Sequence, residues 1–178
     1  FLGLVERSFL DSADGFIHNS NTTQRTVASL APHNRPQVIA YPAGDRFGSP
    51  LSHEAISRRS HCPGPLELLF LGMVIPRKGL LPLLTNLATI DRDIWHLSVV
   101  GGLDFHPAHT ARVKKLICQL DLSDSDELLG PRHDDGLVEI LTRSHIFCMP
   151  CAYEGYGIAM LEAMAFGLPA IGSRKGAA

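Results

Sequence analysis

The sequence lacks both an excess of charge of one sign and a long hydrophobic run. Its 16 Lys and Arg residues stand against 18 Asp and Glu residues, for a net charge of −2. A nucleic-acid- or membrane-binding surface usually carries a basic stripe, so we expect no nucleic-acid partner. No apolar run reaches the roughly 18 residues of a membrane-spanning helix. With 45% hydrophobic residues, the chain is predicted to be globular and about the size of one domain or one and a half.

The sequence also lacks a recognisable set of metal ligands. Its single C-x-x-C motif, Cys148 to Cys151, has no second ligand pair at a suitable spacing. Cys148 falls in a predicted strand, whereas a redox thiol usually lies at a helix N-terminus that lowers its pKa. The HPAH sequence at 106–109 is interpreted as the start of a helix. We therefore expect no metal, and cysteines that suit the reducing cytoplasm.

Strand-like and helix-like segments alternate along the whole chain. The predicted strands are 15–19, 37–41, 66–72, 94–102, 126–130, 145–149 and 169–173. The predicted helices are 1–11, about 21–30, 79–90, 107–120, 134–144 and 157–166. Unbroken apolar strands that alternate with helices indicate a parallel sheet covered on both faces, which is a doubly wound, Rossmann-like α/β domain. Such sheets bind ligands in the loops at the carboxyl ends of their strands.

Composition divides the chain into three parts. We expect 1–41 to be the end of one Rossmann-like domain and 66–178 to be most of a second. Residues 42–65 are rich in Pro, Gly, Ser and Arg and are predicted to be a linker with one possible helical turn at 53–59. The sequence has no initiator methionine and stops soon after a predicted strand, so we expect a piece of a longer protein.

The predicted helix 157–166 has no polar face, so we expect it to be buried nearly all round. Glu162 is its only ionisable residue, and a buried carboxylate needs good hydrogen-bond donors. One interpretation is a structural Glu bonded to backbone or to an Arg. The other is that ligand hydroxyls, such as those of a ribose, fill its acceptor sites.

The loop before this helix favours a nucleotide. Gly155 and Gly157 allow a ligand close to the backbone, and free N–H groups at a helix start attract phosphate. Lys78 and the adjacent Arg77, after the strand 66–72, could neutralise a diphosphate, although a pair of solvated loop residues is the alternative. Neither a Walker loop nor a G-x-G-x-x-G motif occurs, which argues against P-loop NTPases and dinucleotide enzymes.

Four segments together resemble a known family. Glu154 and Glu162 form an E-x7-E spacing in PCAYEGYGIAMLEAMAFGLPAIGS, which resembles the donor-site signature of the family-4 retaining glycosyltransferases of GT-B fold. LLFLGMVIPRKG is similar to the opening strand and basic loop of their C-terminal domain. LLGPRHDDGLVEILTRSHIFCMPC is similar to the segment before the signature. DGFIHNSNTTQRTV resembles the last strand and helix of their N-terminal, acceptor-side domain.

The resemblance implies a role for particular residues around the transferred sugar. Glu154 would be the catalytic-site carboxylate beside that sugar, and Glu162 would hold the ribose of the donor. Lys78 would neutralise the diphosphate leaving group, after the glycine, Gly72, that ends the first strand. No metal is implied, which agrees with the absence of a D-x-D sequence.

Further residues would complete the donor site. The resemblance implies that backbone N–H groups bind the distal phosphate, from Gly155, Tyr156, Gly157 and Ile158. It implies that the base pocket is lined largely by backbone, from Gly130, Pro131 and Arg132.

One departure from the family concerns the phosphate cations. The family usually has Arg directly after the glycine of the first strand, where this chain has Met73. A missing charge-assisted hydrogen bond is worth about 1.5–3 kcal/mol. Arg77, four residues further on, is the candidate substitute. Cys151, where Ser is usual, is a smaller change.

The resemblance implies a metal-independent enzyme of carbohydrate biosynthesis. It would move a sugar from a nucleotide-diphosphate donor, such as a UDP- or GDP-sugar, to a sugar, glycan or lipid-linked acceptor with retention of configuration. Peripheral membrane contact would involve an N-terminal domain outside this chain. None of the nine histidines matches the family's N-terminal histidine site, so we expect nucleotide binding but no turnover by the isolated chain.

Three alternatives stay open. A sugar-nucleotide epimerase shares the architecture. A non-catalytic nucleotide-binding module is supported by Met73. A Rossmann oxidoreductase is the third, and the lack of a glycine fingerprint argues against it.

Overall fold

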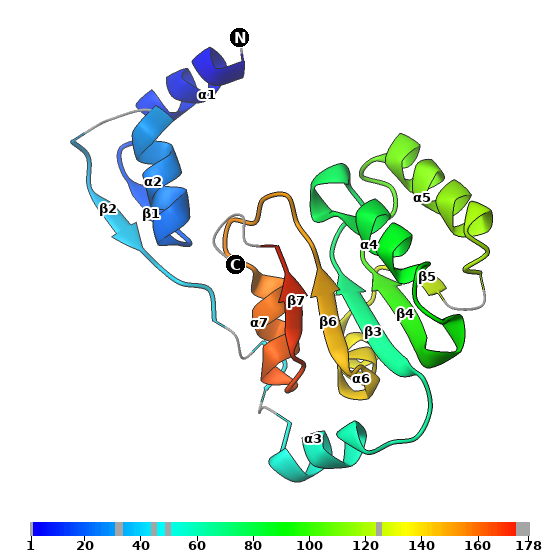
Figure 1. The fold of residues 1–178 in the computed structure, drawn as a ribbon. Helices are drawn as coiled ribbons and strands as arrows, with labels where there is room; N and C mark the ends of the chain where they lie inside the picture. Colours follow the sequence, from blue (N-terminus) through cyan, green and yellow to red (C-terminus); the bar gives the residue numbers. More distant parts are fainter. Residues whose placement is uncertain (1, 31–33, 44–45, 49–50, 124–125, 174–178) are drawn as a thin grey trace.

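The chain folds into a small N-terminal segment and a larger α/β unit (Figure 1). The structure is a computed structural model, and it describes residues 2–30, 34–43, 46–48, 51–123 and 126–173. In the N-terminal segment, helices α1 (Leu2–Asp11) and α2 (Asn21–Leu30) accompany strands β1 (Phe16–His18) and β2 (Gln37–Ile39). The two strands pair in parallel. Ile17 and Val38, at their centres, are exposed, so this small sheet buries little of its own apolar surface.

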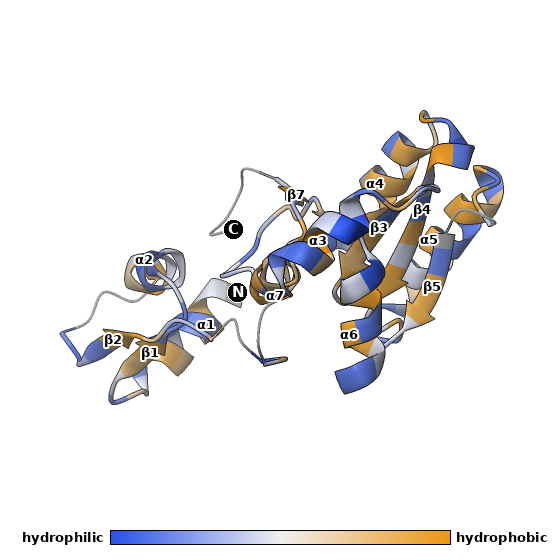
Figure 2. Ribbon diagram, turned by 90° about the horizontal axis from the view of Figure 1, so that it is seen from below, coloured by the Kyte–Doolittle hydropathy of each residue, from blue (hydrophilic) through white to orange (hydrophobic). Residues whose placement is uncertain are grey.

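The larger unit is built on a five-stranded parallel sheet in the order β5-β4-β3-β6-β7. Its strands are β3 (Leu66–Leu71), β4 (Trp95–Val100), β5 (Asp126–Gly130), β6 (Ile146–Met149) and β7 (Ala170–Gly172). The connecting helices are α4 (Leu80–Leu87), α5 (Pro107–Gln119), α6 (Asp134–Arg143) and α7 (Ile158–Ala165). Figures 1 and 2 show α4 and α5 on one face of the sheet and α6 and α7 on the other. Two helices on each face confirm the predicted doubly wound arrangement.

The core lies between the central strands and these helices. Leu69, Phe70, Leu97, Val99 and Phe147 are fully buried, which their unbroken apolar strands predict. The hydropathy colouring of Figure 2 shows hydrophobic strands inside and hydrophilic stretches on the outer surfaces of the helices. Every predicted strand and helix is present, with ends that differ by a few residues.

The segment expected to be a linker contains a real helix. Instead of one possible turn, α3 (His53–Ser60) has eight residues and begins at the cap Ser52, whose hydroxyl accepts a hydrogen bond from the Ala55 N–H. Arg59 ties α3 to the larger unit because its guanidinium donates to the carbonyls of Thr142, Phe166 and Gly167. The boundaries 1–41, 42–65 and 66–178 stay a prediction.

Helix α7 is not buried nearly all round, so that expectation is wrong. Ile158 is 45% exposed and Met164 is 55% exposed, whereas Glu162 and Ala163 are buried. An apolar side chain can be buried, but it becomes buried only where another element packs against it. In the described structure, neighbouring elements cover only one side of α7.

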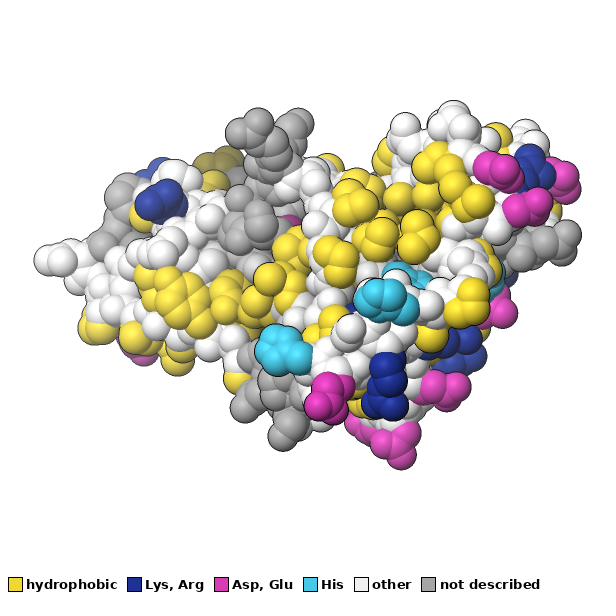
Figure 3. All heavy atoms as spheres, turned by 60° about the horizontal axis from the view of Figure 1, so that its bottom comes forward, with side chains coloured by type: hydrophobic (Ala, Val, Ile, Leu, Met, Phe, Trp, Pro, Cys, Tyr) yellow, Lys and Arg dark blue, Asp and Glu magenta, His cyan; other side chains and the backbone are white. Residues whose placement is uncertain are grey.

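An apolar groove of about 230 Å³ lies on the α4 side of the sheet. Its lining includes Leu66, Leu87, Ile94, Ile146 and Ile171. Figure 3, which brings the lower side of Figure 1 forward, shows hydrophobic side chains gathered on one part of the surface. None of the helices in the described ranges is long and apolar enough to span a bilayer.

Two short 3-10 helices complete the unit. They are η1 (Pro76–Lys78) and η2 (Arg92–Ile94). The first lies between β3 and α4, and it contains the basic residues Arg77 and Lys78.

Candidate functional site

A cleft of about 510 Å³ opens where the carboxyl ends of β3 and β6 meet. Two loops form most of its wall: the one that follows β3 and the one between β6 and α7. The complete lining is Asn19, Arg77, Lys78, Met149, Tyr153, Glu154, Gly155, Tyr156, Gly157, Ile158 and Ala159. Parallel topology explains the position, because adjacent parallel strands that start crossovers on opposite faces leave a crevice between their loops.

A close approach of the two loops positions Lys78. Gly79 ends the 3-10 turn with φ of 77°, and a Cβ there would lie 2.1 Å from the Pro150 carbonyl oxygen. Only glycine therefore fits against the loop after β6. The Ala152 N–H also donates to the Arg77 carbonyl at 2.7 Å, which holds the loops together.

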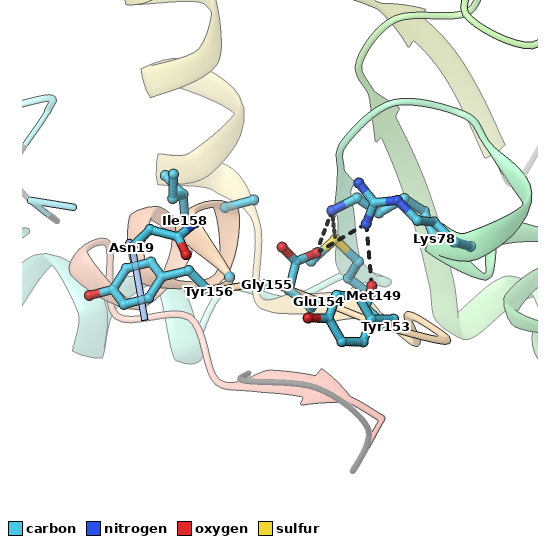
Figure 4. Close-up of a pocket in the computed structure, with 11 residues that line it drawn as sticks. Asn19, Lys78, Met149, Tyr153, Glu154, Gly155, Tyr156 and Ile158 are labelled. Atoms are coloured by element: carbon cyan, nitrogen blue, oxygen red, sulfur yellow. Dashed lines mark hydrogen bonds and ion pairs between the residues drawn. The ribbon is translucent and has the colours of Figure 1, made fainter. Parts of the chain in front are cut away.

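Lys78 is buried and points into the cleft toward Glu154 (Figure 4). Its Nζ lies 2.7 Å from Glu154 Oε2 and 3.6 Å from Met149 Sδ. A Cβ at Gly72 would lie 3.5 Å from Lys78 Cε, so the aliphatic stem runs directly past this glycine. Gly72, directly after β3, therefore borders the Lys78 side chain.

Arg77 reaches the same carboxylate from the solvent side. Its Nη1 lies 3.9 Å from Glu154 Oε2 and donates to the Tyr153 carbonyl at 3.3 Å. Met73 is half-buried and does not belong to the cleft lining, whereas Arg77 does. A second cation, Arg77, thus lies near the loop before α7, although it does not occupy position 73, where the glycosyltransferase family usually has its Arg.

Glu154 is ionised in this environment. Burial alone would raise the pKa of Glu154, but the hydrogen bond and positive charge of Lys78 outweigh it, with smaller help from Cys151 and Arg77, so the pKa lies below its usual range. The cleft of the free protein therefore contains a fixed carboxylate with two cations around it.

The start of α7 supplies backbone N–H groups to the cleft. Gly157 is its N-cap residue, with φ of 87°, so the chain enters the helix through a left-handed turn that glycine favours. Within the described residues, the N–H groups of Gly155, Tyr156, Gly157 and Ile158 donate to no protein acceptor. These are the four residues that the sequence predicts to bind a phosphate, and all of them line the cleft.

Glu162 lies one turn further along α7 and is not one of the residues that line the cleft. It is 5% exposed, and its Oε1 lies 3.4 Å from Arg46 Nη1. Burial raises the pKa of Glu162 above its usual range, and the charge of Arg46 opposes that rise. An Arg partner is the structural alternative that the sequence left open. The Arg46 side chain is 55% exposed, so a ribose could replace it as the hydrogen-bond donor to Glu162.

The predicted base-pocket residues lie on the same edge of the sheet but outside the cleft lining. Gly130 ends β5 with φ of 67°, and its carbonyl accepts from the Gly101 N–H. The Arg132 guanidinium is exposed and donates to the Pro131 carbonyl. Three strand spacings separate β5 from β6, or about 14 Å. The structure therefore does not bring these residues to Glu154, and their role stays a prediction.

Sequence reasoning missed several residues at this site. Asn19 lines the cleft from the N-terminal segment, and the adjacent Ser20 donates a hydrogen bond to the Gly155 carbonyl. Arg46 and Met149 were also not predicted. One available signal was that Asn19 ends the predicted strand 15–19 and Ser20 follows it, where polar residues of parallel sheets often face ligands.

The C-x-x-C pair lacks the properties of a redox motif. Burial raises the pKa of the Cys148 thiol to about 11 and also raises the pKa of Cys151. Cys148 lies in β6, as predicted. In the described ranges, no group of three or more His, Cys, Asp and Glu side chains is placed to hold a metal ion.

Solved structures of similar fold are glycosyltransferases. The Anabaena protein HepE, in complex with UDP and glucose, superposes with a TM-score of 0.80 at 18% identity, over 98% of this chain and 48% of that chain. A glycosyltransferase from Rickettsia africae superposes with a TM-score of 0.74 at 20% identity, over 98% and 49%. At these identities the likeness establishes the fold, which is the predicted GT-B type.

Sequence comparison identifies the family. A GDP-mannose-dependent alpha-(1-6)-phosphatidylinositol monomannoside mannosyltransferase of Mycobacterium tuberculosis is 30% identical over 90% of this chain and 43% of its own length. An MMP alpha-(1->4)-mannosyltransferase of Mycolicibacterium hassiacum is 33% identical over 58% of this chain and 24% of its own length. The profile of the family described as "Glycosyl transferases group 1" matches residues 54–178. The chain belongs to this family, and it spans less than half the length of these relatives. These relatives are glycosyltransferases, so they give no support to the alternative of a sugar-nucleotide epimerase.

Proposed function

We propose that this chain forms the donor-binding part of a retaining glycosyltransferase that transfers a sugar from a nucleoside-diphosphate donor. The observation that carries the proposal is one cleft that brings together Lys78, Arg77, Glu154 and the free N–H groups at the start of α7. Family membership supports the reaction type.

The cleft suits a diphosphate leaving group. When the bond between the sugar and the distal phosphate breaks, its electron pair stays with the phosphate oxygen, and negative charge grows there. Lys78 has three N–H donors, and Glu154 occupies one of them at 2.7 Å. A second donor points to Met149 Sδ at 3.6 Å, so one donor remains for the phosphate. This donor and the backbone N–H groups of α7 are already oriented before reaction, which is the form of electrostatic stabilisation that lowers a barrier most.

Glu154 is proposed as the catalytic-site carboxylate beside the transferred sugar. Because its pKa is lowered, Glu154 stays ionised at neutral pH and can accept hydrogen bonds from the hydroxyl groups of the sugar. Glu162 is proposed to accept hydrogen bonds from the ribose, in place of its contact with the largely exposed Arg46. Gly130 and Arg132 are proposed to border the base at the far end of the nucleotide.

The functions of related proteins suggest the substrate class. One solved relative holds UDP and glucose, and one sequence relative is GDP-mannose-dependent. We therefore propose a UDP- or GDP-sugar donor. We propose a sugar, glycan or lipid-linked acceptor, because a phosphatidylinositol monomannoside mannosyltransferase is among the relatives. Metal independence, a cytoplasmic location and peripheral membrane contact stay predictions.

Nucleotide-dependent thermal stabilisation tests the proposal. The chain would be heated with UDP, GDP or ADP, beside the variant Glu162→Ala and the control Glu139→Ala on the exposed side of α6. A ligand at about 100 times its Kd adds about 2.7 kcal/mol. At about 2–4 °C per kcal/mol for a domain of this size, the expected shift is roughly 5–11 °C. We expect a shift with one nucleotide that Glu139→Ala retains and Glu162→Ala loses.

Two results would contradict the proposal. The first is the absence of any shift in a chain that unfolds cooperatively, which would rule out a nucleotide site. The second concerns turnover: we expect the isolated chain to transfer no sugar, so measurable transfer from a UDP- or GDP-sugar would refute that part.

A further inference from the structure

Ser20 connects the N-terminal segment to the phosphate-binding loop. It is buried at the start of α2, and its Oγ donates to the Gly155 carbonyl at 2.7 Å. We propose that Ser20 is a positioning residue for the distal phosphate of a nucleoside diphosphate, because it fixes the peptide between Gly155 and Tyr156. This inference rests on the proposed function and deepens it.

Ser20 is the donor in its hydrogen bond with Gly155, because a carbonyl oxygen can only accept. Thr23 Oγ1 donates its only proton to Asn19 Oδ1 at 2.7 Å, and the Thr23 N–H donates to Ser20 Oγ at 3.0 Å. The Ser20 hydroxyl therefore accepts from the backbone of α2. Its own proton has two acceptors within reach, Thr23 Oγ1 at 3.0 Å and the Gly155 carbonyl at 2.7 Å, and the contact to Gly155 is the shorter one. Both hydrogen-bonding functions of this buried hydroxyl are used within the protein.

The bond to Gly155 also orients the next amide. The C=O of Gly155 and the N–H of Tyr156 belong to one planar trans peptide unit, so they point in opposite directions. A carbonyl held toward Ser20 directs the Tyr156 N–H to the other side of the loop. Tyr156 lines the cleft, and its N–H has no acceptor within the described residues.

Gly155 makes this constraint necessary. It lies outside the positive-φ region, and a Cβ there would be only in ordinary contact, 3.8 Å from Thr23 Oγ1. Its observed conformation is therefore open to other residues, and glycine leaves the peptide free to rotate. Ser20 supplies the restraint that the glycine itself lacks. An anion site needs oriented N–H groups, so a rotated peptide would remove one donor.

Loss of the Ser20 hydrogen bond should affect mainly the binding of the distal phosphate. A nucleoside monophosphate does not extend to the start of α7, whereas a diphosphate does under the proposed binding mode. Loss of the Ser20 restraint should therefore weaken diphosphate binding without an equal effect on monophosphate binding. A general loss of stability would weaken both nucleotides together.

Calorimetric titration of the 178-residue chain with UDP, UMP, GDP and GMP tests the inference. We expect Ser20→Ala to weaken binding of the preferred diphosphate by about tenfold, with the monophosphate affinity unchanged. The matched control is Ser52→Ala, which also removes a serine N-cap but lies at α3, away from the cleft. Its diphosphate preference should equal that of the wild type.

Two further variants separate the hydrogen bond from the helix cap. Ser20→Thr retains the hydroxyl and should restore the diphosphate preference. Ser20→Asp retains an N-cap acceptor but has no proton to donate at neutral pH, so it should behave as Ser20→Ala does. The aspartate variant provides the test if the alanine variant does not fold.

The outcomes distinguish this inference from the proposed function. If the wild type binds neither diphosphate, the proposed function fails and the inference fails with it. If the wild type binds a diphosphate and the Ser20→Ala or Ser20→Asp chain keeps the same preference over the monophosphate, only the inference is overturned. Equal weakening of both nucleotides would also overturn it.

Discussion

Replacement of Lys78 by methionine should change both the stability of the free chain and its nucleotide affinity. Methionine retains the buried aliphatic stem, but it leaves the carboxylate of Glu154, which is 14% exposed, with only the weak Cys151 thiol donor at 3.6 Å and Arg77 at 3.9 Å. A mostly buried acceptor without its partner costs about 1–3 kcal/mol. Loss of a charge-assisted hydrogen bond to the diphosphate costs about 1.5–3 kcal/mol, or roughly 10–150-fold in Kd.

The stability effect has a defined pH dependence. In the wild type the pKa of Glu154 is lowered, so its stabilisation is present above the unfolded pKa of about 4.3 and is lost as the pH falls through the folded pKa. In the Lys78→Met variant, burial is no longer offset by Lys78, and the pKa of Glu154 should rise. The difference in unfolding free energy between the two chains should therefore be largest near neutral pH and shrink in acid.

Urea unfolding at several pH values and nucleotide titration together measure these effects. Lys115→Met, on the exposed side of α5, is the matched control. Adding Glu154→Gln to Lys78→Met should restore most of the lost stability but none of the affinity. If Lys78→Met matches Lys115→Met in stability at neutral pH and in diphosphate affinity, the reasoning about this pair is wrong.

Three further predictions follow from other buried groups. Burial raises the pKa of Glu162, so the stabilisation linked to its proton is present below pH about 4.3 and is lost as the pH rises through the folded pKa. Glu162→Gln should therefore stabilise the free chain relative to the wild type at neutral pH but not in acid. Urea unfolding at both pH values would measure the difference. Burial lowers the pKa of His109, so the free energy of unfolding should fall as the pH drops below about 6.5. His109→Leu should remove part of that loss. The prediction is wrong if the variant and the wild type lose the same stability over this pH range. With a pKa of about 11 for Cys148, a thiol reagent should modify the exposed Cys62 and Cys118 quickly in the native chain but Cys148 only on unfolding.

The secondary structure could be predicted because its signals are local. Continuous apolar runs such as Leu68–Leu71 and the glycine after them mark a buried parallel strand and its end. The alternation of such strands with helices predicts the doubly wound sheet, and this topology in turn places the loops after β3 and β6 at one edge. Lys78, Glu154 and the start of α7 could therefore be predicted as one site.

The sequence by itself thus determined the elements, their topology and the basic and glycine-rich loops of the cleft. Only the tertiary structure decided which side of α7 is covered and which partners its polar groups have. Arg46 meets Glu162 and Ser20 meets Gly155 across more than a hundred positions of the chain. Periodicity and spacing describe neighbours within a few turns or strand residues, whereas these pairs depend on how distant segments of the chain pack against α7 and the loop before it.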